Sequence, residues 1–95
     1  MSKQDEVVLA ELAAWSALSA ARAVYDDAAR SARLALTATT RARRAPLSPK
    51  SGAKIEIVEA RLRAKRAEMA AANQVANDLY VAWQAALTAK LALTK

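Results

Sequence analysis

Apolar residues in the second half of the chain recur at steps that alternate between three and four positions. These positions hold Ile55, Val58, Leu62, Lys65, Met69, Ala72, Ala76, Leu79, Trp83, Ala86, Lys90 and Leu93. Ten of the twelve are apolar, and Lys65 and Lys90 are the two departures. Such steps place side chains on one face of a helix and form the seam of a coiled coil. The pattern predicts one long helix over about residues 53–94.

The first half carries a looser apolar stripe, which predicts a second long helix over about residues 3–42. The stripe consists of Val8, Leu12, Trp15, Leu18, Ala21, Tyr25, Ala28, Ala32 and Ala35. Five more apolar residues lie beside it, namely Val7, Leu9, Val24, Leu34 and Leu36. Because one partner helix cannot cover both sets, we expect this helix to have a second buried side. Strands are excluded, since the apolar positions do not alternate and alanine is a poor strand former.

The strong helix breakers lie within seven residues, between these two patterns. They are Pro46, Pro49 and Gly52, and about 40 residues on either side contain neither Pro nor Gly. The clustering predicts a single turn over about residues 43–52. The second helix can begin at Ser48, with Pro49 in its first turn, or at Ser51, and the residues alone leave both starts open.

The ends of the first helix carry signals of their own. Ser2 followed three residues later by Asp5 resembles a capping box, which closes the first turn of a helix. Acidic residues near this end and the cluster Arg41, Arg43 and Arg44 near the other suit the helix dipole.

These elements predict an all-α fold with one domain over residues 1–95: an alanine-rich, coiled-coil-like antiparallel two-helix hairpin. Folding at about residue 49 pairs positions whose numbers sum to about 98, so we expect Trp15 at the level of Trp83. A hairpin has little area to bury, so we expect self-association into a helical bundle or docking on a larger assembly. The candidate packing or interface residues are Leu12, Trp15, Leu18, Tyr25, Val58, Leu62, Met69, Leu79 and Trp83.

Composition excludes most catalytic chemistry. Alanine supplies 27 of the 95 residues, and there is no His, Cys or Phe and only one Gly. The chain therefore has no disulfide, zinc finger, thiol nucleophile, histidine base or glycine-rich phosphate loop. A di-metal helical bundle needs Glu-x-x-His, which is absent. We expect a protein that is not an enzyme and binds no cofactor or metal.

Targeting signals are not evident in the sequence. Lys3 is followed two residues later by Asp5 and then by Glu6, which is the wrong polarity for a secretory signal. The longest uncharged stretch is the eleven residues 79–89, whereas a membrane-spanning helix needs about 20 apolar residues. We expect a cytoplasmic protein, or one within a particle, with no membrane span.

Positive charge is concentrated around the turn. Residues 41–66 hold nine basic and two acidic residues, a net charge of +7 in a chain whose total is +6. Such a cluster attracts phosphate backbones or an acidic protein surface. No aromatic residue lies between positions 26 and 79, so base stacking there is excluded. The candidate polyanion-binding residues are Arg41, Arg43, Arg44, Lys50, Lys54, Arg61, Arg63 and Arg66.

The sequence leaves more than one function open. Our first hypothesis is a non-enzymatic structural or assembly protein, a subunit of an oligomer or particle such as a virion, whose basic turn faces a polyanion. The alternative is a small dimeric DNA- or RNA-binding regulator that uses the same turn. A helix that acts at a membrane surface is a third reading, although alanine faces bury too little area for strong membrane binding. The basic turn can also be only a solvated end that complements the helix dipoles.

Overall fold

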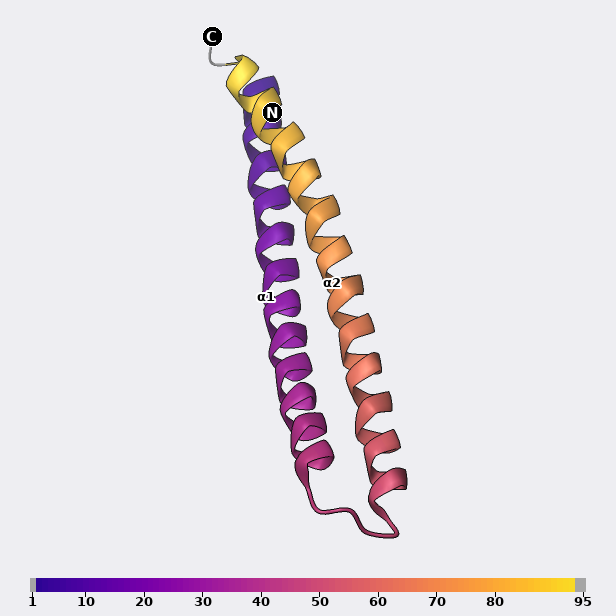
Figure 1. The fold of residues 1–95 in the computed structure, drawn as a ribbon. Helices are drawn as coiled ribbons and strands as arrows, with labels where there is room; N and C mark the ends of the chain where they lie inside the picture. Colours follow the sequence, from indigo (N-terminus) through magenta and orange to yellow (C-terminus); the bar gives the residue numbers. More distant parts are fainter. Residues whose placement is uncertain (1, 94–95) are drawn as a thin grey trace.

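Two long helices joined by one loop make up the computed structural model, which describes residues 2–93 (Figure 1). Helix α1 spans Lys3–Arg44 and helix α2 spans Ser51–Leu93. They run antiparallel, so the start of α1 and the end of α2 lie at one end of the molecule and the loop lies at the other (Figure 1). We call the loop end the tip and the other end the open end. The all-α two-helix hairpin predicted from the sequence is confirmed.

The molecule is a rod and not a compact particle. Its dimensions are 71 × 19 × 13 Å and its radius of gyration is 21.0 Å. A compact chain of this length would have a radius of gyration of about 12 Å. The long shape follows directly from two helices of 42 and 43 residues that contain no internal break.

Helix α1 begins and ends where local chemistry requires it. The Ser2 hydroxyl accepts a hydrogen bond from the Asp5 N–H at 3.2 Å, which confirms the predicted cap. The helix ends at Arg44, because the next residue, Ala45, precedes Pro46 and adopts an extended backbone with φ −66° and ψ 150°. The proline ring disfavours helical geometry in the residue before it. The helix therefore runs two residues beyond the predicted end at 42.

The loop decides between the two possible starts of the second helix. Pro49 and Lys50 form a turn, and α2 begins at Ser51. The Ser51 hydroxyl accepts the Ser48 N–H at 2.7 Å, while the Ser51 N–H donates to the Ser48 carbonyl at 3.0 Å. Both serines are thus used, Ser48 to close the turn and Ser51 to begin the helix. The predicted C-terminal end at 94 lies outside the described residues.

The seam predicted for α2 is confirmed almost throughout. Eleven of its twelve positions are buried or half-buried, and Leu93 is the exposed one. Lys65 and Lys90, the two polar departures, are half-buried and lie in the seam. Each pairs with a carboxylate: Lys65 with Glu68 at 3.4 Å and Lys90 with Glu11 at 3.8 Å. Their long aliphatic stems can pack in the seam while the charge stays at its edge.

The seam of α1 differs from the predicted stripe towards the open end. Val7, Glu11 and Ala14 turn inward, whereas Leu12 is 54% exposed and Trp15 is 43% exposed. The predicted stripe required three successive steps of three, from 12 to 15 to 18 to 21, and these rotate the stripe away from the partner helix. Continuing back from Leu18 by alternating steps keeps the contact and brings positions 14, 11 and 7 to α2.

Beyond the seam, α1 is not covered by α2. Leu9, Val24, Leu34 and Leu36 are all exposed, so the second buried side expected for this helix is not formed within the hairpin. Among residues 2–93, the buried hydrophobic core consists of Leu18, Ala21, Ala32, Ala35, Ala42 and Leu62.

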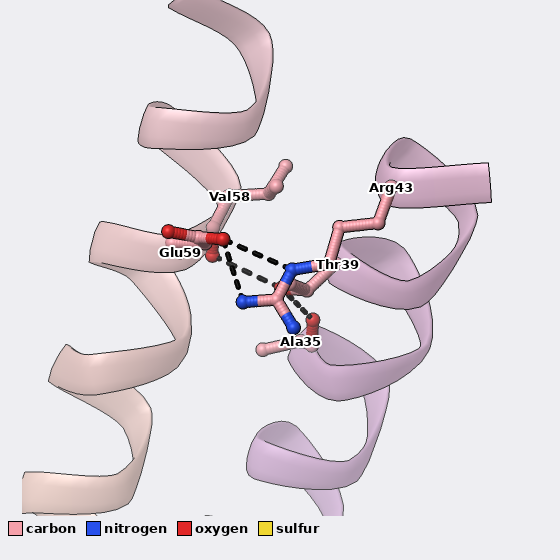
Figure 2. Close-up of polar contacts among 5 residues, drawn as sticks. All are labelled: Ala35, Thr39, Arg43, Val58 and Glu59. Carbon is pink, nitrogen blue, oxygen red and sulfur yellow. Dashed lines mark hydrogen bonds and ion pairs between the residues drawn. The ribbon is translucent and has the colours of Figure 1, made fainter. Parts of the chain in front are cut away.

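Small residues bring the two helices close together near the tip. The Thr39 side chain is buried, and its hydroxyl lies 2.9 Å from the Ala35 carbonyl and 3.3 Å from the Val58 carbonyl of α2 (Figure 2). A side chain as short as threonine reaches the backbone of another helix only when the helix axes approach closely. The buried alanines on either side of Thr39 permit that approach.

Helix α1 is long and apolar enough, by length and composition, to cross a membrane. One 18-residue window has a mean hydropathy of 1.5, and 11% of that window is buried. The sequence expectation considered only uncharged stretches, whereas this window admits up to two charged residues. Core helices of soluble proteins and signal sequences meet the same criterion, so it does not assign α1 to a membrane.

Replacing Leu18 by Ala is expected to lower the free energy of unfolding by about 2–4 kcal/mol. Leu18 is 1% exposed and is the largest buried side chain of α1. Replacing Leu34 by Ala, at a position that is 67% exposed, should change the free energy of unfolding by less than about 0.5 kcal/mol. Urea unfolding followed by circular dichroism at one protein concentration measures both. Equal losses for the two variants would contradict the observed seam.

Candidate functional site

The basic residues predicted to bind a polyanion surround the tip and extend along both helices. All eight are exposed. Arg66 lies fifteen residues into α2, about 22 Å from the start of the helix at 1.5 Å per residue. The cations therefore cover about a third of the 71 Å rod and are not confined to the loop. Folding brings the cations together, since residues 41–44 end α1, Lys50 lies in the loop, and residues 54–66 lie in the first turns of α2.

Most of the tip cations have no carboxylate partner. Within residues 2–93, seven of the eight form no ion pair: Arg41, Arg44, Lys50, Lys54, Arg61, Arg63 and Arg66. Of the two acidic residues in this region, Glu59 is paired and Glu56 is not. The positive potential of the tip is therefore not neutralised by the hairpin itself.

Arg43 is the exception among the tip cations. Its Nε and Nη2 atoms donate to Oε1 of Glu59 at 3.0 and 2.6 Å, and this contact joins α1 to α2 (Figure 2). The Arg43 side chain is 62% exposed, so the pair contributes little to stability, under about 1 kcal/mol. The Arg43–Glu59 pair matters more for the candidate site, because it engages one of the eight cations predicted to bind a polyanion.

A shallow groove lies against the loop. It has a volume of about 370 Å³ and is lined by Ala42, Ala45, Pro46, Ser48, Lys50, Ser51 and Lys54. Two lysines, Lys50 and Lys54, belong to its lining, and the Ser48 and Ser51 hydroxyls are hydrogen-bonded to each other at 3.1 Å. The groove can receive an anionic group at the surface, but it is not an enclosed substrate cavity.

The open end contains a polar contact that the sequence did not reveal. The Trp83 indole Nε1–H donates to Glu11 Oε1 at 3.0 Å, and Lys90 Nζ lies 3.8 Å from Glu11 Oε2. The Glu11 side chain is only 12% exposed. This carboxylate therefore has both a hydrogen-bond donor and a cation from the opposite helix. The signal that could have found it is the alternating step that leads back from Leu18 through Ala14 to Glu11.

Three aromatic rings and one guanidinium group gather beside that contact. The Trp15 and Trp83 ring centroids are 5.2 Å apart, as expected from the pairing of the two halves. The Tyr80 ring lies 5.9 Å from Trp83, and the Arg22 guanidinium carbon lies 5.9 Å from the centroids of both Trp15 and Tyr80. Tilted rings at these distances attract one another, and the cation over two ring faces adds to this.

The nine candidate packing residues fall into three groups. Leu18 and Leu62 are buried, whereas Leu12 and Trp15 are exposed beside the seam. The remaining five are half-buried in the seam: Tyr25, Val58, Met69, Leu79 and Trp83. Trp15 is exposed but still contacts α2 through Trp83. Leu12 is therefore the residue that departs most from the packing role predicted for it.

The side chains described by the structure form no cluster suited to hold a metal ion. Among residues 2–93, no group of three or more Asp and Glu residues could hold a metal ion. Over the same range, every buried side-chain nitrogen or oxygen has a hydrogen-bond partner. The described residues instead present two surfaces that could bind a partner, namely unpaired cations at the tip and exposed apolar side chains at the open end.

Comparison with known proteins gives no family for this chain. No family model matches it, and no curated protein or solved structure is significantly similar to it.

Replacing Glu11 by Ala is expected to lower the free energy of unfolding by about 1–2 kcal/mol, because the Trp83 N–H and Lys90 lose their shared acceptor. Glu56→Ala, which removes an exposed carboxylate without an ion pair, should change it by less than about 0.5 kcal/mol. Urea unfolding gives the two values. A red shift of tryptophan emission in the Glu11 variant alone would locate the effect at the open end.

Proposed function

We propose that this chain is a non-enzymatic structural subunit of a larger assembly, in which its open end docks on protein and its basic tip contacts a polyanion. The observation that carries the proposal is the division of one rod into two chemically distinct ends. A net charge of +7 lies in residues 41–66, while the exposed aromatic side chains, Trp15 and Tyr80, lie towards the open end. A rod of this kind can link a protein surface to a charged polymer.

The phosphate backbone of a nucleic acid is the polyanion that fits the tip best. Seven unpaired guanidinium and ammonium groups spread over about 22 Å can contact several successive phosphates. Residues 41–66 contain no aromatic side chain for base stacking. The expected binding is therefore governed by charge and has little sequence preference. A virion or comparable particle that contains nucleic acid is one setting for such a subunit.

A small dimeric DNA- or RNA-binding regulator is the second candidate, and the same unpaired cations favour it. The two functions differ in specificity. A regulator must prefer its site over other sequences by a large factor, whereas a packing subunit need not. Competition between unrelated duplexes of equal length distinguishes them.

Removing Arg41 and Arg44 together, as Arg41→Gln with Arg44→Gln, is expected to flatten the salt dependence of duplex binding. Each phosphate contact contributes about 0.9 to the slope of log K against log salt, so the slope should fall by nearly two units. The control is Arg30→Gln with Arg33→Gln, which removes the same charge from α1 outside the tip. Filter binding or fluorescence anisotropy between 50 and 200 mM salt measures the slope. Equal effects of the two pairs, or no binding by the parent, would contradict the tip assignment.

Replacing Glu59 by Gln is expected to have the opposite effect. It frees the Arg43 guanidinium, which is tied to Glu59 in the hairpin, and so adds a cation to the tip. The slope should steepen by about one unit, while the free energy of unfolding changes by less than about 1 kcal/mol. Glu56→Gln is the matched control, since it removes the same charge without freeing an arginine. A steeper slope for both variants alike would show that only net charge matters.

A further inference from the structure

We propose that the open end binds a second copy of this chain, so that two hairpins overlap at their open ends and their tips point in opposite directions. This inference rests on the proposed function, because it names the protein on which the open end docks.

The contact surface is a patch made of Val8, Leu12, Trp15, Tyr80 and Arg22, which we call the open-end patch. The first four side chains are between 39% and 54% exposed although all are large and apolar or aromatic. Val8, Leu12 and Trp15 follow one another by steps of four and three, so they form one stripe on α1. Arg22 lies over both Trp15 and Tyr80, which joins that stripe to α2. Trp, Tyr and Arg are the residue types that dominate binding hot spots.

The surface area of the hairpin calls for a partner of substantial size. The accessible surface is 6980 Å² for a chain of 10.1 kDa. A compact monomer of that mass exposes about 5,300 Å², so the hairpin exposes roughly 1,700 Å² in excess. A standard protein interface buries about 800 Å² on each partner, and permanent homodimers bury more. One interface between two hairpins is therefore of the right size to remove much of the excess.

The charge of the patch fits a second copy better than a different, charged partner. An acidic protein would be drawn to the tip, since the positive charge lies there and not at the open end. A two-fold interface places the same patch against itself, and like charges in it would repel. Arg22 is the one charged member of the patch, and it is placed over its own aromatic rings. The patch can thus meet its own copy without a strong electrostatic penalty.

The same charges set the orientation of the pair. If two hairpins lay side by side in the same direction, their tips, each of net charge +7, would be within about 30 Å of each other, which is two or three helix diameters. If the two hairpins point in opposite directions, their tips are separated by at least the 71 Å length of the rod. The resulting assembly carries a polyanion-binding tip at each end and can bridge two segments of nucleic acid.

Sedimentation equilibrium at micromolar concentration tests whether a second copy of the chain binds the open-end patch. The parent chain is expected to be a dimer, and Leu12→Glu should weaken it at least about thirtyfold by placing a charge in the patch. Leu34→Glu is the control, since it makes the same change at an exposed leucine of α1 towards the tip. Both variants should keep their helical circular dichroism. Dissociation by Leu34→Glu and not by Leu12→Glu would overturn the assignment of the patch.

Spin-label distances test the orientation. The chain has no Cys, so Leu47→Cys in the loop, which is 90% exposed, and Ser16→Cys on the outer side of α1 each provide one labelling site. The expected result is a distance of less than about 40 Å between Ser16 labels and no distance below about 60 Å between Leu47 labels. Short distances at both sites would indicate tips side by side and overturn the proposal.

Two other outcomes separate this inference from the proposed function. A monomer that still binds duplex DNA through its tip would overturn the second copy as the partner and leave the proposed function standing. A monomer that does not bind DNA would overturn both. Vesicles of neutral phosphatidylcholine test whether α1 enters a membrane instead, because α1 is long and apolar enough to span one. Insertion into those vesicles with loss of the dimer would make a membrane, and not a second copy, the occupant.

Discussion

Two helices can share only one seam, and the rest of this structure depends on that geometric limit. Each helix presents one stripe to the other, and the remaining faces stay in contact with solvent. Alanine makes the shared stripe narrow, so the helices approach closely enough for the Thr39 hydroxyl to reach the α2 backbone. Close approach stabilises the contact by packing but buries few carbon atoms. The hairpin is therefore held along its whole length by a thin core, and its large side chains remain available outside it.

The polar residues inside the seam show how such a thin core tolerates charge. Lys65 and Lys90 are in the seam of α2, and Glu11 is in the seam of α1. Each lies next to an oppositely charged group, and Glu11 also accepts the indole N–H of Trp83. In a thick core these charges would be costly to bury. In a two-helix seam their ends reach solvent, so burying these charges costs little. The contacts of Glu11 with Lys90 and Trp83 also join α1 to α2, whereas the Lys65–Glu68 pair lies within α2.

The same limit explains why function must be sought on the surface. The grooves found within residues 2–93 are open to solvent, and one of them is lined by Ala21, Val24, Ala71, Ala72 and Val75 with Glu68. The rod instead separates two kinds of surface by most of its length. Charge at the tip acts at a distance and is weakened by salt, whereas the aromatic open end acts only on contact. That separation suits a protein that connects two different partners.

The sequence by itself determined the two helices, their connection and the charge of the tip. The absence of Pro and Gly outside positions 46–52, the alternating steps of α2 and the cluster of basic residues are local properties, and local interactions are enough to express them. Only the tertiary structure decided which side of α1 meets α2. Near the open end two stripes one residue apart were both available, and the choice placed Glu11 against Trp83 and left Leu12 exposed. It also tied Arg43 to Glu59 across the hairpin, which removed one cation from the predicted eight. Such choices depend on the rotation of one helix against the other, and rotation is set by contacts between residues far apart in the chain.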